Sequence, residues 1–485
     1  MALGITSSIS GLTGCFNASS EFSANLTDLS ASDLSMAIRD KQTSCVEVMQ
    51  AYLDRIHTYN PVYNAIISMV DDDTLLNQAF EADQALSRGE YQGWMHGMPH
   101  AAKDLTPVAG LPYTSGSPMF ADRIAQNDSQ TVAKIRKAGA IFIGKTNVPE
   151  FGLGSQSYNP LFGATSSAYN PSLTSGGSSG GAACGLGTRM LPVADGSDMM
   201  GSLRNPGAFN NVIGFRPSAI VMNGMDSDPR VLSTSGPMGR NTQDTIRLLQ
   251  TIAAGSVAEQ FTPMNLRNIR LGWMGNMDNY LAMETGVLEL CESNLTTAAD
   301  AGAIVESILP RLELSDLWFS WTTLRHNSRE EMLDFYNDPA TRTQLKTDLI
   351  WEIEQYLSLG ENDVGNANMI RGNWYREIDR LFASYDFLLL PTSQVFPYSK
   401  ETPWPTEING RFMDTYHRWM EVTLYASLGG LPVVNVPVGF DNQGRPMGMQ
   451  IIGNYGEDQK VLEFALAYEQ ITDHLDQRPN LIAAN

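Results

Sequence analysis

Between residues 97 and 217, short apolar runs alternate with helical stretches and turns rich in Gly, Ser and Asn, and this pattern most strongly constrains the fold. Residues 138–144, 191–194 and 212–215 have the composition of buried strands. Residues 129–138 and 181–187 between them favour helices. Strands that alternate with helices are typical of an α/β protein. We therefore expect a large mixed, mainly parallel β-sheet covered by helices on both faces.

The sequence pattern in the rest of the chain indicates one domain that contains an insertion. Residues 275–380 are charged, aromatic and helix-rich, with few strand signals, whereas buried-strand patterns return at 387–390 and 433–438. Because strands flank this block, we expect a single domain over residues 26–485 that carries a helix-rich insertion, or cap, at about 275–380. We expect residues 1–25 to be a flexible N-terminal tail.

Composition excludes several classes of function. The 485 residues include 32 Lys and Arg against 53 Asp and Glu, so the net charge is −21, which disfavours nucleic acid as a partner. No apolar stretch approaches the ~18 residues that a membrane span needs. The four cysteines form no C-x-x-C pair and the six histidines no H-E-x-x-H motif. We expect neither a metal site nor a cofactor.

The N-terminus leaves the compartment open to two interpretations. The segment Leu12-Thr13-Gly14-Cys15 resembles a bacterial lipoprotein cleavage box, but no Lys or Arg precedes it, as an export signal would require. A cytoplasmic protein is therefore the favoured expectation, with an exported lipoprotein as the alternative.

Residues 175–181, with the sequence SGGSSGG, form the most unusual segment. Neither a G-x-G-x-x-G nor a P-loop pattern is present, which disfavours nucleotide binding, and no G-x-S-x-G nucleophile elbow is found. Helix-forming Ala182 and Ala183 follow at once, which disfavours a solvated linker. A second serine turn lies downstream, at residues 198–204, and upstream Lys103 follows two alanines.

Together these three segments resemble the amidase signature family of serine hydrolases. Lys103 precedes Ser178 by 75 positions, and Ser178 precedes Ser202 by 24, which is the layout of that family. The resemblance extends from about residue 30 to residue 467, apart from the helical block. Further matching blocks are Ala138 to Phe151, Gly214 to Pro217, Ser235 to Pro237, Leu428 to Pro432 and Gly444 to Gln450.

The resemblance implies a Ser–cis-Ser–Lys triad with Ser202 as nucleophile, Ser178 as bridging serine after a cis peptide bond, and Lys103 as base. Such a lysine must be neutral, and burial lowers the pKa of an amine towards neutrality. The other implied site residues are as follows. Gly176 and Gly177 relieve crowding at the cis bond, Ser179 supports the triad by hydrogen bonds, Asp198 and Arg204 form an ion pair beside the turn, and the backbone N–H groups of Met199, Met200, Gly201 and Ser202 form the oxyanion hole.

The activity implied is hydrolysis of the amide C–N bond of a small molecule through an acyl-enzyme, without metal. The 23 methionines, the aromatic segment from Trp404 to Trp419 and the uncharged loop from Phe151 to Phe162 suggest a pocket for a mainly apolar acyl or aryl part. A carbamate (urethane) or ester hydrolase with the same triad is the alternative. A glutamine-dependent amidotransferase subunit is the alternative of another class. Met199 and Met200 stand where the family usually has small residues, and this departure argues against the amidotransferase. We expect a monomer or a homodimer.

Overall fold

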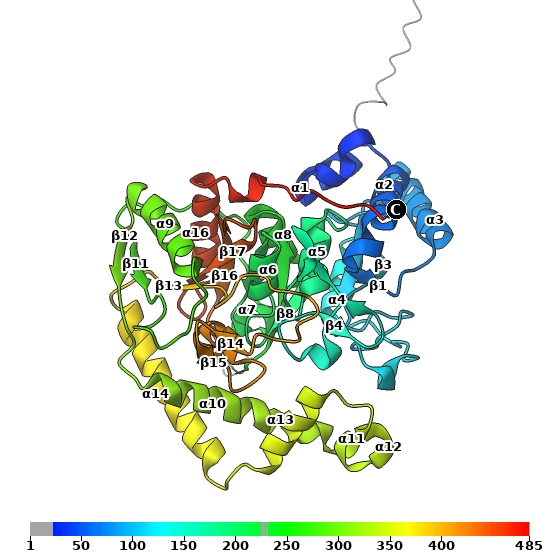
Figure 1. Ribbon diagram of the computed structural model, residues 1–485. Coiled ribbons are helices and arrows are strands. Elements are labelled where there is room, and N and C mark those ends of the chain that lie inside the picture. Colours follow the sequence, from blue (N-terminus) through cyan, green and yellow to red (C-terminus); the bar gives the residue numbers. More distant parts are fainter. Residues whose placement is uncertain (1–22, 225–227, 229–230, 485) are drawn as a thin grey trace, which may run out of the picture.

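The computed structural model describes residues 23–224, 228 and 231–484 (Figure 1). Most of the expected tail and the lipoprotein-like segment at residues 12–15 lie outside these residues. Residues 23–25, also assigned to the tail, belong to the 3₁₀ helix η1 (Ser23–Asp28). In the described part of the chain, no helix is both long and apolar enough to cross a membrane.

An eight-stranded sheet forms the centre of the molecule. Its strands, in spatial order, are β12 (Ile304–Ser307), β11 (Arg270–Trp273), β13 (Phe387–Pro391), β17 (Pro446–Ile452), β16 (Val433–Phe440), β9 (Ile213–Arg216), β10 (Thr234–Gly239) and β8 (Val193–Asp198). The mixed α/β class is confirmed.

The expectation of a mainly parallel sheet is wrong. Only the pairs β12–β11 and β11–β13 are parallel, whereas β13–β17, β17–β16, β16–β9, β9–β10 and β10–β8 are antiparallel. Strands β8 and β9 run in the same direction, but they are not neighbours, because β10 inserts between them in the opposite direction. Strands β16 and β17 are joined by a short turn, which permits only antiparallel pairing.

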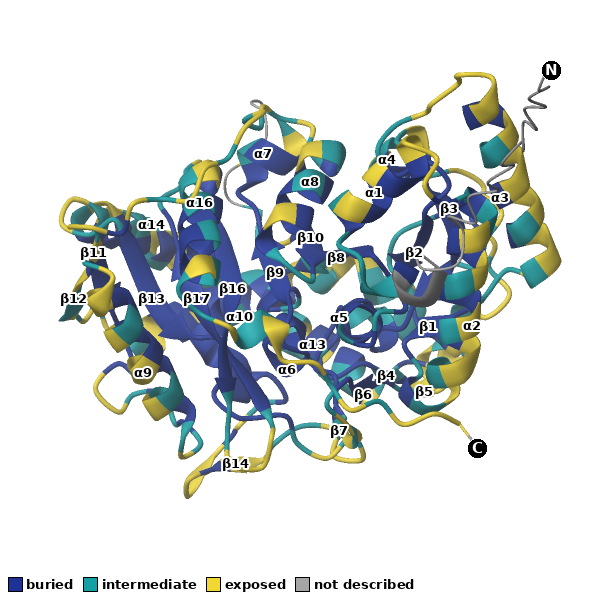
Figure 2. Ribbon diagram, turned by 90° about the horizontal axis from the view of Figure 1, so that it is seen from above, coloured by how far each residue is buried: buried dark blue, intermediate teal, exposed yellow. Residues whose placement is uncertain are grey.

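Helices cover both faces of this sheet, as expected. Every residue of β9, β13 and β17 is buried (Figure 2). Because successive side chains of a strand point to opposite faces, both faces of these strands must be covered. Helices α8 (Thr242–Ile252), α9 (Val287–Asp300) and α16 (Asp458–Gln470) pack on the strands, and so does α6 (Arg204–Phe209), which contacts β9, β16 and β17.

A second, three-stranded sheet has the order β1 (Ile66–Ile67), β3 (Ile141–Thr146) and β2 (Pro99–Lys103), with β2 and β3 parallel. Helices α1 (Ala31–Arg39), α2 (Cys45–Tyr63) and α3 (Asp72–Ser87) lie on this side of the molecule (Figure 1). Ser44 and Glu47 form a capping box at the start of α2.

The remaining short elements connect the two sheets or lie at their edges. They are α4 (Gln130–Lys137), α5 (Gly180–Gly187), α7 (Ala219–Asn223), α15 (Leu424–Gly429), β4 (Tyr158–Asn159), β5 (Gly163–Ala164), β6 (Ser166–Ser167), β7 (Asn170–Thr174), β14 (Glu407–Ile408), β15 (Arg411–Phe412), and the 3₁₀ helices η2 (Pro118–Phe120), η3 (Glu150–Gly152), η5 (Arg418–Thr423) and η6 (His474–Asp476).

The helical insertion begins later than expected. The predicted block 275–380 contains β12, the edge strand of the main sheet, and α9, which packs on that sheet. The excursion itself comprises α10 (Leu314–Asn327), η4 (Ser328–Met332), α11 (Leu333–Asn337), α12 (Pro339–Arg342), α13 (Thr347–Leu357) and α14 (Asp363–Phe382), at the bottom of Figure 1. We call these elements the helical insertion.

Candidate active site

Lys103 lies at the end of β2 with no exposed surface. Its Nζ is within hydrogen-bond distance of Ser178 Oγ (2.8 Å), Ser179 Oγ (2.8 Å), and Ser197 Oγ (3.0 Å) and carbonyl oxygen (3.3 Å). Burial of the amine lowers the pKa of Lys103 from 10.5 to about 7, against the opposing effect of two nearby carboxylates. This side chain can therefore exchange a proton near neutral pH.

Ser178 follows a cis peptide bond at Gly177–Ser178, as the resemblance implied. The loop that carries it runs from β7 to α5 and is packed too closely for larger residues. A side chain at Gly177 would begin 2.9 Å from the backbone nitrogen of Gln156, and Gly176 has a φ of +72°. The Gly177 carbonyl oxygen also accepts a hydrogen bond of 2.6 Å from Ser155 Oγ. These contacts fix the loop and direct Ser178 towards Lys103.

Ser202 lies in the turn between β8 and α6, and buried Asp198 organises that turn. Its carboxylate accepts hydrogen bonds from the N–H of Gly201 (2.8 Å) and of Leu203 (3.1 Å). It also forms the expected ion pair with Arg204, at 2.8 Å. Burial alone would raise the pKa of Asp198, but the neighbouring arginines lower it to about 2. A permanent anion thus holds the turn in place.

The arrangement of this turn corrects one expectation. Because Gly201 donates its N–H to Asp198, that group points into the protein and is not available to a substrate. The N–H groups of Met199, Met200 and Ser202 have no acceptor among the described residues. Met199 and Met200 both line the cavity beside the turn, and Met200 is almost fully buried.

Ser178 and Ser202 open onto one cavity of about 130 Å³. It is lined by Leu105, Phe151, Gly152, Leu153, Gly154, Ser178, Ser197, Met199, Met200, Ser202, Ser233, Arg325, Arg329 and Met420. Leu105, Phe151, Leu153 and the methionines form an apolar wall, whereas the aromatic segment from Trp404 to Trp419 does not line this cavity. Arg325 and Arg329 from the helical insertion form a charged wall, which was not predicted from the sequence.

Several residues around Lys103 were not predicted from the sequence. Ser197 supplies two of its acceptors, and Asp195 accepts from its backbone N–H at 3.3 Å and also contacts His100 at 3.1 Å. Asp195 and Ser197 are two positions apart on β8, so both project to the face that contacts β2. The signal was present in the alternation Asp-Gly-Ser-Asp, but its meaning required knowledge of which strand lies beside it.

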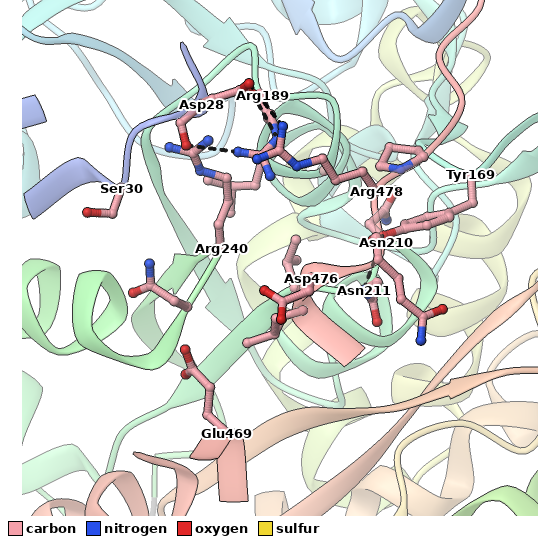
Figure 3. Close-up of a pocket in the computed structure, with 17 residues that line it drawn as sticks. Asp28, Ser30, Tyr169, Arg189, Asn210, Asn211, Arg240, Glu469, Asp476 and Arg478 are labelled. Atoms are coloured by element: carbon pink, nitrogen blue, oxygen red, sulfur yellow. Dashed lines mark hydrogen bonds and ion pairs between the residues drawn. The ribbon is translucent and has the colours of Figure 1, made fainter. Parts of the chain in front are cut away.

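A second cavity, of about 250 Å³, lies apart from this site and shares none of its lining residues (Figure 3). Asp28 connects two of its arginines there, through Arg478 Nη1 at 2.9 Å and Arg189 Nε at 3.5 Å. Arg240 donates to the carbonyl oxygens of Thr27 and Leu29. These contacts attach the end of η1 to Arg189, to Arg240 and to the C-terminal segment through Arg478.

The sequence is similar to those of known proteins over nearly the whole chain. The family model "Amidase" matches residues 47–462. An acylamidase of Rhodococcus erythropolis is 29% identical over 94% of this chain and 98% of its own length. A glutamyl-tRNA(Gln) amidotransferase subunit of Thiobacillus denitrificans is 31% identical over 94% of this chain and 99% of its own length.

Solved structures agree with these matches. The crystal structure of a bacterial aryl acylamidase of the amidase signature family superposes with a TM-score of 0.84, at 24% identity, over 92% of this chain and 98% of the other. The two proteins therefore share the same fold. The chain therefore belongs to the amidase signature family of amide-hydrolysing enzymes.

Proposed function

We propose that the enzyme cleaves amide C–N bonds through an acyl-enzyme formed on Ser202, with Ser178 and Lys103 as a proton relay. One observation carries the proposal: a fully buried lysine with a lowered pKa contacts a serine whose hydroxyl opens onto the same cavity as a second serine. A serine hydroxyl is a weak nucleophile unless a neighbouring base removes its proton.

The contacts of Lys103 suit a neutral amine that accepts from Ser178. A neutral amine has two N–H donors and one lone pair. Ser179 Oγ accepts one donor, and Ser197 accepts the other through its Oγ at 3.0 Å or its carbonyl oxygen at 3.3 Å. The lone pair is then left for the hydroxyl proton of Ser178 at 2.8 Å. Ser178 then accepts the proton of Ser202 as that oxygen attacks the carbonyl carbon. The same proton returns through Ser178 to the departing nitrogen, and a water molecule repeats the sequence to release the acid.

Negative charge develops on the carbonyl oxygen during this attack. The N–H groups of Met199, Met200 and Ser202 are the donors proposed to stabilise it, since Gly201 is engaged by Asp198. Loss of such a donor costs about 3–4 kcal/mol of transition-state stabilisation in other hydrolases. Asp198 and its arginine then contribute by fixing the turn rather than by touching the substrate.

The proposed substrates are small amides with an apolar acyl or aryl part, which the wall of Leu105, Phe151 and Met420 accommodates. The names of the acylamidase relative and of the aryl acylamidase structure support this class. Carbamates and esters present the same carbonyl and remain the second group of substrates. Glutamine would be the substrate if the enzyme acted as part of an amidotransferase, as the names of several relatives indicate for those proteins.

Covalent labelling tests the assignment of the nucleophile. A fluorophosphonate probe should modify Ser202, and peptide mapping identifies the adduct. Ser233 lines the same cavity and provides the matched control: Ser233→Ala should label and turn over as the wild type does, whereas Ser202→Ala should do neither. An adduct on another residue of an active enzyme would refute the assignment.

A substrate panel tests the reaction class. Turnover of an acetanilide, a primary fatty amide, an aryl carbamate, an aryl ester and glutamine is compared on the same preparation. We expect the anilide or fatty amide to have the highest kcat/KM. Preferential hydrolysis of glutamine would instead support the amidotransferase alternative.

A further inference from the structure

Two arginines of the helical insertion form the charged wall of the catalytic cavity. Arg325 on α10 and Arg329 on η4 are four residues apart, so both reach the same side. Their side chains are only 7% and 12% exposed. Both pair with one carboxylate, because Glu352 on α13 accepts from Arg325 Nε at 2.7 Å and from Arg329 Nε.

The other groups that contact this cluster add no charge that would balance it. Tyr416 accepts from Arg325 Nη2 at 2.7 Å and donates to Glu352. His417 stacks on Tyr416, and burial holds the pKa of His417 well below its usual value, so it is neutral. Two cations and one anion leave a net charge of +1 among the described residues of the cluster. An unbalanced charge so poorly exposed favours a bound anion.

Donors of both arginines remain without a strong acceptor. Arg325 Nη1 lies 3.0 Å from Met199 Sδ, and a thioether sulfur is a weak acceptor. The Nη1 and Nη2 groups of Arg329 have no acceptor among the described residues. Both side chains line the cavity that contains Ser178 and Ser202. The free donors therefore belong to side chains that border the space that a substrate would occupy.

We infer that Arg325 and Arg329 form a carboxylate-binding subsite, so that the preferred substrates are amides that carry a carboxylate as well as an apolar part. This inference rests on the proposed function, since it names the substrate class of the same site. The planar guanidinium matches a carboxylate through paired hydrogen bonds. A substrate oxygen would replace Met199 Sδ at Arg325, next to the turn that carries Ser202.

Matched substrate pairs test this subsite. N-phenylsuccinamate carries the carboxylate on its acyl part, and 4-methyl-N-phenylpentanamide has an isopropyl group in its place. The pair 4-acetamidobenzoate and 4-isopropylacetanilide places the same exchange on the amine part. For one of the two pairs, wild-type kcat/KM should be about ten- to a hundredfold higher for the carboxylate, as expected for a charge-assisted contact. A preference for the isopropyl compound in both pairs would overturn the inference.

Variants identify the residues that recognise the charge. Arg329→Gln should reduce the ratio between carboxylate and isopropyl substrates at least tenfold, mainly through a higher KM for the carboxylate, and Arg329→Lys should retain part of it. Arg342→Gln removes an exposed arginine of the same insertion and should leave the ratio unchanged. An Arg329→Gln enzyme with the wild-type ratio would contradict the inference. If this variant does not fold, the wild-type comparison still decides.

Binding to a Ser202→Ala enzyme separates this inference from the proposed mechanism. Calorimetry should show tighter binding of the carboxylate than of its isopropyl analogue, whether or not turnover occurs. Carboxylate binding without any amide turnover by the wild type would refute the proposed function and retain the subsite. Turnover of amides with no preference for carboxylates would do the reverse.

Discussion

The pKa of Lys103 gives the sharpest prediction about this enzyme. If burial lowers this pKa from 10.5 to about 7, half of the amines are neutral at pH 7, compared with roughly 0.03% for an unperturbed lysine. The protein fold thus increases the amount of free base about 1,500-fold at that pH. Because protonated Lys103 has no lone pair for Ser178, kcat/KM should fall tenfold per pH unit below about 7 and level off above it.

Substitutions test whether the lysine acts as a base. Lys103→Ala should lower kcat/KM for an anilide by ~10²–10⁴. Lys103→Arg should not restore it, since a guanidinium stays protonated at any working pH. Esters should lose less than amides, because an alkoxide needs less help from a returning proton than an amine nitrogen does.

Lys145 provides the matched control. It lies on the neighbouring strand β3, is fully buried, and has a pKa lowered by burial to about 8, but its Nζ donates to Thr106 and contacts none of the site serines. The assay is kcat/KM between pH 5 and 10 for the wild type, both Lys103 variants and Lys145→Arg. A Lys103→Arg enzyme with most of its amide activity would refute the reasoning. The reasoning would also be refuted if only the Lys145→Arg substitution shifted the pH below which kcat/KM falls.

Further predictions concern stability and metal. Asp198→Asn should lower the free energy of unfolding by about 3–5 kcal/mol in urea titrations at pH 7, because its buried arginine partners lose their anion. Gly181→Ala should lower the free energy of unfolding by about 1–3 kcal/mol, since the new methyl group would lie 2.3 Å from the backbone nitrogen of Asn147. Gly365→Ala in α14 should raise it by about 0.5–1 kcal/mol, because alanine favours the helix and no atom lies within 4 Å of the new methyl group. Ser44→Ala should cost about 1 kcal/mol through loss of the cap of α2. Activity should survive prolonged EDTA treatment, because the sequence contains no metal-binding motif.

The sequence by itself determined much of the local structure and predicted the residues of the proposed triad. Alternating apolar runs marked strands such as β9 and β13, and the S-x-x-E pattern at Ser44 marked the start of α2. These signals act over a few residues, so they can be read without the fold. The triad was predicted because Lys103, Ser178 and Ser202 have the spacing of the family that the sequence resembles.

Strand direction and the detailed chemistry of the site were decided by the tertiary structure. Nothing local to β8 or β9 reveals that β10 inserts between them in the opposite direction, because strand pairing depends on segments distant in the chain. Asp198 is near Gly201 in sequence, but only the folded turn shows that it accepts the Gly201 N–H. The cavity wall depends on Arg325, which lies more than a hundred residues after Ser202 and reaches it only when the helical insertion packs against the turn. The pKa of Lys103 likewise follows from burial by several distant segments, since desolvation is a property of the whole surrounding volume and not of neighbouring residues in the chain.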